Sequence, residues 1–231
     1  MKAAAIIVAA GSSERFGGPV PKQFVEVAGR PLLAWTIARF EAAELIDTIT
    51  VVVAEESLAF AREKVLASGG FKKVAGLVAG GATRRESVRR GLEQLPRSTS
   101  IVAIHDGARP LVAPTDIDAV VKLAGTERAA MLAVRTSDTV KRVREGYVMA
   151  TLDRNGLYLA QTPQVFQYDL IMEAHRKAAD DADVTDDASL VEALGFKVRV
   201  LEPTTLNLKV TTRQDLAAVG ALLKEAEHGR G

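Results

Sequence analysis

The first apolar run of the chain breaks directly into a glycine-containing loop, and this junction constrains the fold more than any other feature. Residues 5–9 read AIIVA, and three glycines follow within residues 10–20. A short apolar run that ends in such a turn predicts a strand that opens into a loop. Arg15 and Lys22 stand on either side of the paired glycines, so the loop suits a binding site for a triphosphate.

The spacing of this loop excludes two familiar nucleotide motifs. A P-loop requires G-x-x-x-x-G-K-[ST], whereas Lys22 is preceded by Pro21 and followed by Gln23. A dinucleotide fingerprint requires G-x-G-x-x-G, and residues 10–24 contain no G-x-G. The loop is therefore either an anion site of another kind or simply a glycine-rich turn after a strand.

Strand and helix patterns alternate along residues 1–134. Strands are expected at 48–53, 73–78, 100–104 and 129–134, and helices at 31–44, 55–68, 83–95 and 114–123. The alternation predicts an α/β fold built on a doubly wound, mostly parallel sheet with right-handed crossovers. Because the chain has 231 residues and 48% hydrophobic content, it can bury its core as a single domain, residues 1–231.

The pattern changes from about Asp138. Residues 139–144 and 147–152 read as two short strands around a tight turn, with too little apolar surface to be stable alone. We expect this hairpin to protrude as a dimerisation arm, at about residues 138–154, and to rest on a partner subunit. Beyond it we expect strands at 164–166, 196–201 and 206–210, helices at 168–179 and from Thr185 or Asp186 to Leu194, and a last helix from Thr212 or Arg213.

The charge balance argues against two classes of partner. Thirty basic and 29 acidic residues give a formal charge of +1, so we expect neither a nucleic-acid partner nor a membrane partner. The N-terminal apolar run is too short for a spanning helix and lacks a signal-peptide pattern. The chain has no cysteine, which excludes disulfides and is compatible with a reducing compartment, so we expect a cytoplasmic protein.

Several basic residues lie in loops or at element ends rather than on regular helix faces. Singly, each has the ordinary explanation of a solvated surface charge. Together they indicate a site for several phosphate groups, because positioned cations stabilise a transition state at phosphorus. The residues in question are Arg15, Lys22, Arg84 or Arg85, Arg109, Arg154 and Lys209.

Asp106 and His105 follow an expected strand, at the edge of an open α/β sheet where ligands bind. Asp106 is either a turn cap or a carboxylate that helps to place Mg²⁺ and phosphates. His105 we interpret as structural, because three scattered histidines and no cysteine offer no zinc site. The five aspartates within residues 180–187 are expected to form a solvated turn. No nucleophile with a paired base stands out, so no covalent intermediate is expected.

Seven blocks of this sequence, in order along nearly the whole chain, resemble a known enzyme family. The blocks are AAGSSERFGGPVPKQF at 9–24, GGATRRES at 80–87, HDGARP at 105–110, DTVK at 138–141, LDRNGLYLAQTPQVF at 152–166, VTDDAS at 184–189 and LKVTT at 208–212. The family is that of 2-C-methyl-D-erythritol 4-phosphate cytidylyltransferase, a Rossmann-like nucleotidyltransferase of the non-mevalonate isoprenoid pathway. One such block alone would be weak, whereas seven in order are specific.

The resemblance implies transfer of a cytidylyl group from CTP to methylerythritol phosphate, with Mg²⁺ bound mainly through the CTP phosphates. It implies a catalytic role for Arg15 and Lys22, which would stabilise the α-phosphate in the transition state. The nucleotide-binding residues that it implies are Ala10, Gly11, Gly81, Ser87 and Asp106. The residues implied for methylerythritol phosphate are Thr139, Arg154, Thr162, Thr185 and Lys209. Since Thr139 and Arg154 belong to the arm, each site would be shared across a homodimer.

The sequence departs from the family pattern at two positions. Ala82 stands where many relatives carry an acidic residue, which puts a side-chain contact to the nucleotide there in doubt. Gly107 replaces a common alanine, which we take to be a small change. Two other functions remain open: a cytidylyltransferase for a pentitol phosphate such as ribitol 5-phosphate, and a CTP-binding regulator without turnover.

Overall fold

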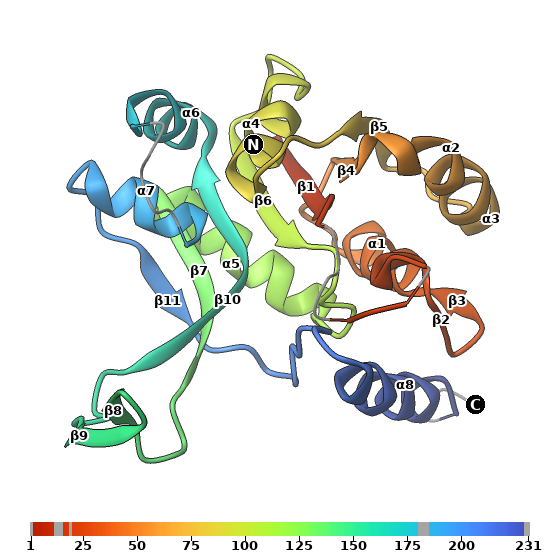
Figure 1. Ribbon diagram of the computed structural model, residues 1–231. Coiled ribbons are helices and arrows are strands. Elements are labelled where there is room, and N and C mark those ends of the chain that lie inside the picture. Colours follow the sequence, from red (N-terminus) through yellow and green to blue (C-terminus); the bar gives the residue numbers. More distant parts are fainter. Residues whose placement is uncertain (1, 12–15, 19, 180–184, 229–231) are drawn as a thin grey trace.

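A seven-stranded sheet forms the centre of the molecule (Figure 1). The computed structural model describes residues 2–11, 16–18, 20–179 and 185–228. The strand order is β11-β7-β10-β6-β1-β4-β5. The bounds are β1 (Ala3–Ala9), β4 (Thr48–Val53), β5 (Val74–Ala79), β6 (Ile101–Asp106), β7 (Ala129–Arg135), β10 (Tyr158–Gln167) and β11 (Arg199–Leu201).

The sheet is mostly parallel. β1 pairs in parallel with β4 on one side and with β6 on the other, and β5 and β11 also pair in parallel with their neighbours. β10 is the exception, because it runs antiparallel to both β6 and β7. The chain therefore builds the sheet outward from β1 in one direction and then returns to the other side at β6. This confirms the predicted α/β class and places a topological switch point between β1 and β6.

Helices cover both faces of the sheet. The core on one face includes residues of α1 (Leu32–Ala42) and α5 (Pro114–Glu127), and the core on the other includes α4 (Arg84–Glu93), α6 (Tyr168–Lys177) and α7 (Asp187–Ala193). Residues of β1 alternate between the two cores, because successive side chains of a strand point to opposite faces. Burial on both faces explains why β1 is apolar throughout.

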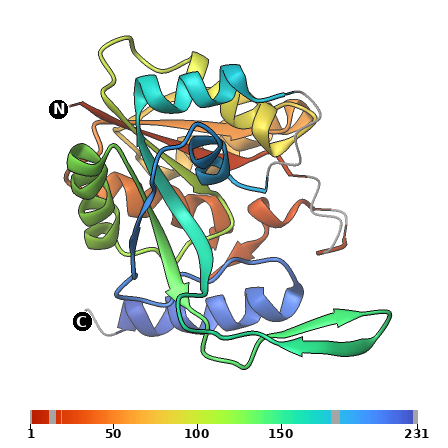
Figure 2. The ribbon, with the colours of Figure 1, turned by 90° about the vertical axis from the view of Figure 1, so that its left-hand side faces the viewer.

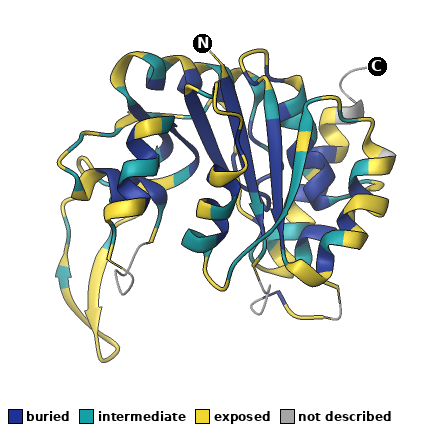
Figure 3. Cartoon of the chain, turned by 90° about the horizontal axis from the view of Figure 1, so that it is seen from above, coloured by how far each residue is buried: buried dark blue, intermediate teal, exposed yellow. Residues whose placement is uncertain are grey.

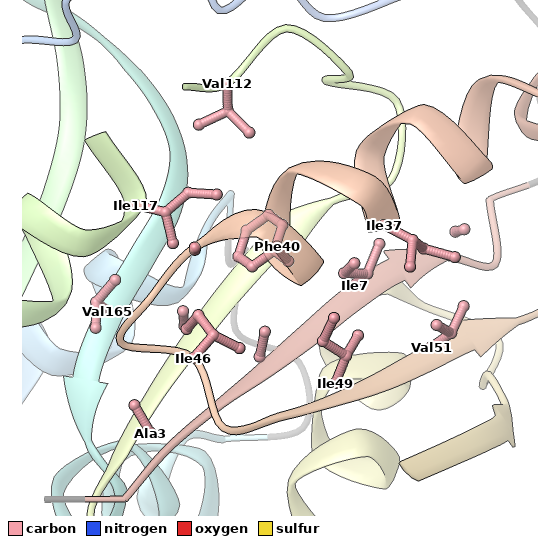
Figure 4. Close-up of a cluster of buried hydrophobic side chains, with 14 of the residues drawn as sticks. Ala3, Ile7, Ile37, Phe40, Ile46, Ile49, Val51, Val112, Ile117 and Val165 are labelled. Atoms are coloured by element: carbon pink, nitrogen blue, oxygen red, sulfur yellow. The ribbon is translucent and has the colours of Figure 1, made fainter. Parts of the chain in front are cut away.

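The buried residues concentrate along the strands and on the inner sides of the helices, as Figure 3 shows. In the first core, Phe40 of α1 is fully buried and points toward the sheet, near Ile7 and Ile117 (Figure 4). Full burial of a side chain of this size contributes about 1.5–3 kcal/mol to folding.

A third core lies under the C-terminal helix, α8 (Arg213–His228). Phe16, in the middle of the opening loop, packs in the same cluster as Val219 and Leu223 of this helix. Arg213 lies over the ring of Phe16, 5.7 Å from its centroid. α8 therefore fastens the middle of the glycine loop to the body of the molecule.

Two segments differ from the prediction. The helix expected at 55–68 is a mixed one: a 3₁₀ turn (Glu55–Ser57), α2 (Leu58–Phe60), a π-helical stretch (Ala61–Leu66) and α3 (Ala67–Gly69). The strand expected at 206–210 was wrong, because this segment joins no sheet. Its polar groups bond instead to the backbone of β10 and of the turn after β6, since Asn207 Nδ2 donates to Thr162 O and Val210 N to Ala108 O. The local sequence pattern does not show whether the backbone of this segment pairs with a strand or whether its polar groups bond to other parts of the fold.

The predicted hairpin is present as β8 (Lys141–Arg144) and β9 (Tyr147–Thr151), which form a sheet of their own. It projects from the body in both ribbon views (Figures 1 and 2). Glu145 and Gly146 turn the chain with φ of 52° and 83°, which suits the twist of a tight hairpin. Val143, Tyr147 and Val148 are exposed, at 55%, 74% and 61%. The arm therefore offers an apolar surface that its own chain leaves uncovered.

No helix in the described part of the chain is long and apolar enough to cross a bilayer.

Candidate active site

A cavity of about 720 Å³ opens at the carboxyl ends of the central parallel strands. Its wall includes residues at or just beyond the ends of β1, β4, β5 and β6. It thus lies at the switch point of the sheet, where ligands bind in open α/β folds. The lining includes all five residues implied for the nucleotide, Ala10, Gly11, Gly81, Ser87 and Asp106, together with Lys22, Arg84 and Lys209.

Small residues let two loops approach each other closely on one wall of this cavity. A Cβ at Gly80 would lie 2.4 Å from the Cβ of Ala10 and 2.8 Å from Ser87 Oγ. Ser87 Oγ accepts a hydrogen bond from Gly81 N at 3.0 Å and donates one to Thr83 O at 2.9 Å. Glycine at position 80 is therefore required by the contact between the loops, because any larger residue would separate them.

The start of α4 holds the same wall. Thr83 caps the helix by accepting from Glu86 N at 3.1 Å, as the capping-box pattern predicts. The Glu86 carboxylate accepts from Ala82 N at 2.8 Å and from Arg90 at 2.7 Å, and these bonds lower its pKa. Glu86 therefore orders the backbone beside Ala82.

Lys22 stands at the mouth of the cavity, on a 3₁₀ turn formed by residues Lys22–Phe24. The next residue fastens this turn to the sheet, because Gln23 Nε2 donates to Ala9 O at 2.9 Å and is buried. Lys22 is thereby held opposite the end of β1. Arg15, the other predicted catalytic residue, lies outside the described residues, so its role stays a prediction.

Asp106 is the electrostatic centre of the site. It ends β6, and its carboxylate lies 2.8 Å from Lys209 Nζ, 3.3 Å from Arg84 Nε and 3.6 Å from Arg109 Nε. Burial alone raises the pKa of a carboxyl, but here the attraction of Arg84, Lys209 and Arg109 outweighs it. The pKa of Asp106 is therefore held far below its ordinary range, and the residue stays ionised.

Of the predicted pair Arg84 or Arg85, the structure brings Arg84 to the cavity. Arg85 instead donates to the backbone oxygens of Ala178 and Ala179. Arg84 is one helical turn before Ser87, and residues three apart share a helix face. This spacing was the signal in the sequence that could have distinguished the two arginines. Burial lowers the pKa of Arg84. The attraction of Asp187 and Asp106 raises this pKa by a larger amount, so the net shift is upward and the guanidinium stays charged.

The predicted structural role of His105 agrees with its surroundings. The ring is fully buried, and its centroid lies 4.8 Å from that of Phe40. Asp106 N donates to Thr162 Oγ1 at 3.0 Å, so the Thr162 hydroxyl can donate to His105 Nδ1, also 3.0 Å away. Nε2 then donates to Arg109 O at 3.1 Å. The chain of bonds selects one tautomer of a neutral ring, and burial lowers the pKa of His105 to about 4.

We expect His105 to make the protein less stable as the pH falls. The unfolded histidine binds a proton below its pKa of about 6.5, whereas the folded ring resists protonation. The free energy of unfolding should fall by ~2 kcal/mol from about pH 7 to about pH 5 for this reason. Urea unfolding of wild type and His105→Gln across that range tests it, because glutamine cannot titrate. Equal pH slopes for the two proteins would contradict the assignment.

A second cavity, of about 200 Å³, adjoins the first. It contains three of the residues implied for the acceptor, Thr162, Thr185 and Lys209, and it also contains Arg109 and Gln164. The two cavities share Arg84, Asp106 and Lys209 as a common wall. Gln164 was missed by sequence reasoning. Its amide bonds Asp186 Oδ2 at 2.7 Å and Ala188 N at 2.9 Å, which ties β10 to the start of α7.

The structure does not bring the remaining two acceptor residues to this cavity. Thr139 and Arg154 are exposed at the base of the arm. Arg154 Nη1 donates to Ser137 O, which closes the base of the hairpin within the same chain. Their part in a site depends on a second subunit, and it stays a prediction.

The acidic stretch at 180–187 was expected to be a solvated turn, with Thr185 or Asp186 starting the next helix, and for Asp187 the solvated turn was wrong. Asp186 caps α7 by accepting from Ser189 N at 3.0 Å. Asp187 is buried, because it pairs with Arg84 at 2.7 Å and lies 3.5 Å from His175. The other three aspartates lie outside the described residues. A run of acidic residues is expected to be solvated unless the fold brings cations to it. The cation here is Arg84, which is 103 positions away in sequence, so the local pattern does not predict the pairing.

Gly107 also proves more constrained than the sequence suggested. A Cβ at this position would lie 2.9 Å from the Cβ of Ala9 and 3.2 Å from Val8 O. The backbone of β1 and the turn after β6 are therefore in contact here, and Gly107 N donates to Val8 O at 2.8 Å. An alanine would require the two strands to move apart beneath Asp106.

A family model described as 2-C-methyl-D-erythritol 4-phosphate cytidylyltransferase matches residues 3–225. A protein of that name from Pelotomaculum thermopropionicum is 44% identical over 231 residues, covering 99% of this chain and 97% of the relative. One from Geotalea uraniireducens is 41% identical over 233 residues, covering 100% of both chains.

Solved structures agree with these sequence matches. A 4-diphosphocytidyl-2C-methyl-D-erythritol synthase from Anaerococcus prevotii superposes with a TM-score of 0.84 at 29% identity, covering 96% of each chain. A 2-C-methyl-D-erythritol 4-phosphate cytidylyltransferase from Thermus thermophilus superposes with a TM-score of 0.78 at 32% identity, covering 97% of this chain and 100% of that one. The similarity therefore extends over the whole fold.

Proposed function

Because this chain belongs to the 2-C-methyl-D-erythritol 4-phosphate cytidylyltransferase family, we propose that it transfers CMP from CTP to 2-C-methyl-D-erythritol 4-phosphate. The reaction yields 4-diphosphocytidyl-2-C-methyl-D-erythritol and pyrophosphate, in the synthesis of isoprenoid precursors. The observation that carries the proposal is the wall of Arg84, Asp106 and Lys209 between two adjoining cavities. Such a wall suits two phosphorylated substrates that must meet at one phosphorus atom.

The larger cavity suits CTP. Ala10, Gly11, Gly81 and Ser87 would line the base and ribose, since glycine turns let backbone groups approach a base edge. The triphosphate would then extend toward Lys22, with Arg15 as its expected partner from the same loop. Charge that develops on the α-phosphate during the reaction is stabilised by cations already held in position.

The smaller cavity suits the phosphate of the acceptor. Lys209 and Arg109 supply positive charge there, and Thr162 and Thr185 supply hydroxyl groups. An acceptor phosphate oxygen attacks the α-phosphorus of CTP, and the bond from that phosphorus to the β-phosphate oxygen breaks. The electron pair leaves with pyrophosphate. Asp106 keeps Arg84 and Lys209 at the place where both substrates need them.

Mg²⁺ would bind mainly through the CTP phosphates and would neutralise their charge. Asp106 fits such an ion as an oxygen ligand at the floor of the cavity. Its two oxygens already face Arg84, Arg109 and Lys209, so we expect phosphate and water to supply most of the remaining ligands. A cytoplasmic location also stays a prediction.

One assay tests the proposed function. Purified protein with Mg²⁺, CTP and methylerythritol phosphate should release pyrophosphate. Turnover with ribitol 5-phosphate and none with methylerythritol phosphate would instead make it a pentitol-phosphate cytidylyltransferase. CTP binding without pyrophosphate release, with any acceptor, would identify a nucleotide-binding regulator.

We further propose that the arm, residues 138–154, crosses to a second subunit of a homodimer and brings Thr139 and Arg154 to its site. The exposed Val143, Tyr147 and Val148 support this, because an isolated hairpin with such a surface is only marginally stable.

Deletion of residues 140–151 should convert the protein to a monomer and abolish turnover. The two ends of the deleted segment lie close together, since Leu152 N donates to Val140 O at 2.9 Å. Sedimentation measures the mass, and circular dichroism checks that the body remains folded. A dimer that persists after the deletion would refute the shared site.

A further inference from the structure

The guanidinium of Arg84 is held from two sides at the wall between the two cavities. Its Nε donates to Asp106 Oδ1 at 3.3 Å, and its Nη1 donates to Asp187 Oδ2 at 2.7 Å. A guanidinium has five N–H donors, and the hydrogen bonds to described residues use two of them. The group can therefore be fixed by the protein and still donate to a phosphate oxygen.

Asp187 reaches this site only through Arg84. Its side chain is 1% exposed, and among the described lining residues of the two cavities Arg84 is present and Asp187 is not. On its other side, Asp187 Oδ1 lies 3.5 Å from Nε2 of His175, a buried residue of α6. Asp106, Arg84, Asp187 and His175 thus lie in a row, in which hydrogen bonds of Arg84 join the first three.

The position of Asp187 is not explained by helix capping. Asp186, the residue before it, is the N-cap of α7 and accepts from Ser189 N. A buried carboxylate is costly unless it is paired, so a residue that served the helix alone would be exposed or uncharged. The ion pair between the buried Asp187 carboxylate and Arg84 must therefore have a role other than capping the helix.

We propose that Asp187 is a positioning residue, which fixes the Arg84 guanidinium where the nucleotide and acceptor cavities meet and so raises the rate of transfer without touching either substrate. The proposal rests on the proposed function, because it assigns a role within that reaction. The short bond to a carboxylate that is itself buried removes most of the freedom of a long side chain. Small displacements matter here, since a shift of ~1 Å in a positioned group can cost about 10²-fold in rate.

The first test is Asp187→Asn, which keeps the shape and removes the charge. Loss of one charge-assisted bond should lower kcat by about ten-fold, with little change in the KM for CTP. The matched control is Asp116→Asn, since Asp116 is also a buried acid in the first turn of a helix, and among the described residues its carboxylate accepts hydrogen bonds from Thr204, in a neighbouring loop. If both variants lose equal stability and equal activity, Asp187 is merely structural and the proposal fails.

A double variant distinguishes positioning of Arg84 by Asp187 from a general loss of structure around the site. Arg84→Met removes the group that Asp187 is said to hold, so Asp187→Asn should have almost no further effect on kcat in that background. If the kcat reductions of the two single variants multiply in the double variant, Asp187 does not act through Arg84 and the proposal is overturned. Should the asparagine variant fold poorly, Asp187→Glu takes its place: it keeps the charge, displaces the guanidinium by about one methylene length and should lower kcat measurably.

A structural measurement keeps the proposal separate from the proposed function. The NMR signal of the Arg84 Nε–H group, assigned with Arg84→Lys, should show a fixed side chain in wild type and in Asp116→Asn but a mobile one in Asp187→Asn. An equally rigid Arg84 signal in Asp187→Asn would overturn the proposal. If wild type released no pyrophosphate, the proposed function would fail, while this signal would still decide whether Asp187 holds Arg84.

Discussion

Replacement of Lys22 by alanine should lower kcat by about 10²-fold or more, which is the cost of removing one positioned group that stabilises charge in a transition state. Lys22 lies at the mouth of the larger cavity, on a turn that Gln23 fastens to the end of β1. Because the turn is held by its neighbour, the variant loses the ammonium group and keeps the backbone. Steady-state kinetics with both substrates varied measures the effect.

The controls for this variant come from the same chain. Lys122→Ala removes an exposed lysine on α5 and should leave kcat unchanged. Lys22→Arg keeps the charge in a different shape and should recover part of the rate. A loss confined to the KM for CTP would show that Lys22 binds the ground state and contributes nothing specific to the transition state.

Asp106→Asn should reduce kcat by a similar factor and also destabilise the fold. The substitution leaves Arg84, Arg109 and Lys209 close together without the carboxylate that pairs with all three. Removing one partner from a buried ion pair costs about 3–5 kcal/mol, and the partial exposure of Arg84 and Lys209 places the loss toward the lower end of this range. Chemical denaturation and steady-state kinetics on the same preparation measure both effects.

The pH dependence gives this prediction a second readout. The pKa of Asp106 is lower in the folded protein than in the unfolded chain, so its contribution to stability is complete above the unfolded value of about 4 and decreases below it. The difference in unfolding free energy between wild type and Asp106→Asn should therefore be constant near neutral pH and shrink as the pH falls below about 4. A difference that does not change with pH would mean that the Asp106 carboxylate is not stabilised by its cations.

Most of the secondary structure could be predicted from the sequence, because its signals are local. The apolar run of β1, the capping box at Thr83 and the turn at Glu145-Gly146 each depend on neighbours a few residues away. The mixed helix at 55–69 and the segment at 206–210 were harder for the opposite reason. In both cases, the regular pattern competes with contacts from elsewhere in the fold.

The candidate site also contains features that the sequence predicts and features that depend on distant contacts. Glycines and strand ends alone predicted only a place for phosphates at the edge of an α/β sheet, and the resemblance to a family supplied the nucleotide residues, the base and the acceptor as expectations. The choice of Arg84 over Arg85 and the burial of Asp187 were not predicted. Both follow from an ion pair between residues 103 positions apart.

By itself the sequence determined the α/β class, the protruding hairpin and the family, and it predicted the loop after the first strand as a place for phosphates. Only the tertiary structure decided that Asp106 gathers Arg84, Arg109 and Lys209, and that Asp187 lies buried behind Arg84. The physical reason is that strand, turn and cap preferences act within a few residues. The charge state and position of a buried side chain depend on which distant elements the sheet topology brings against it.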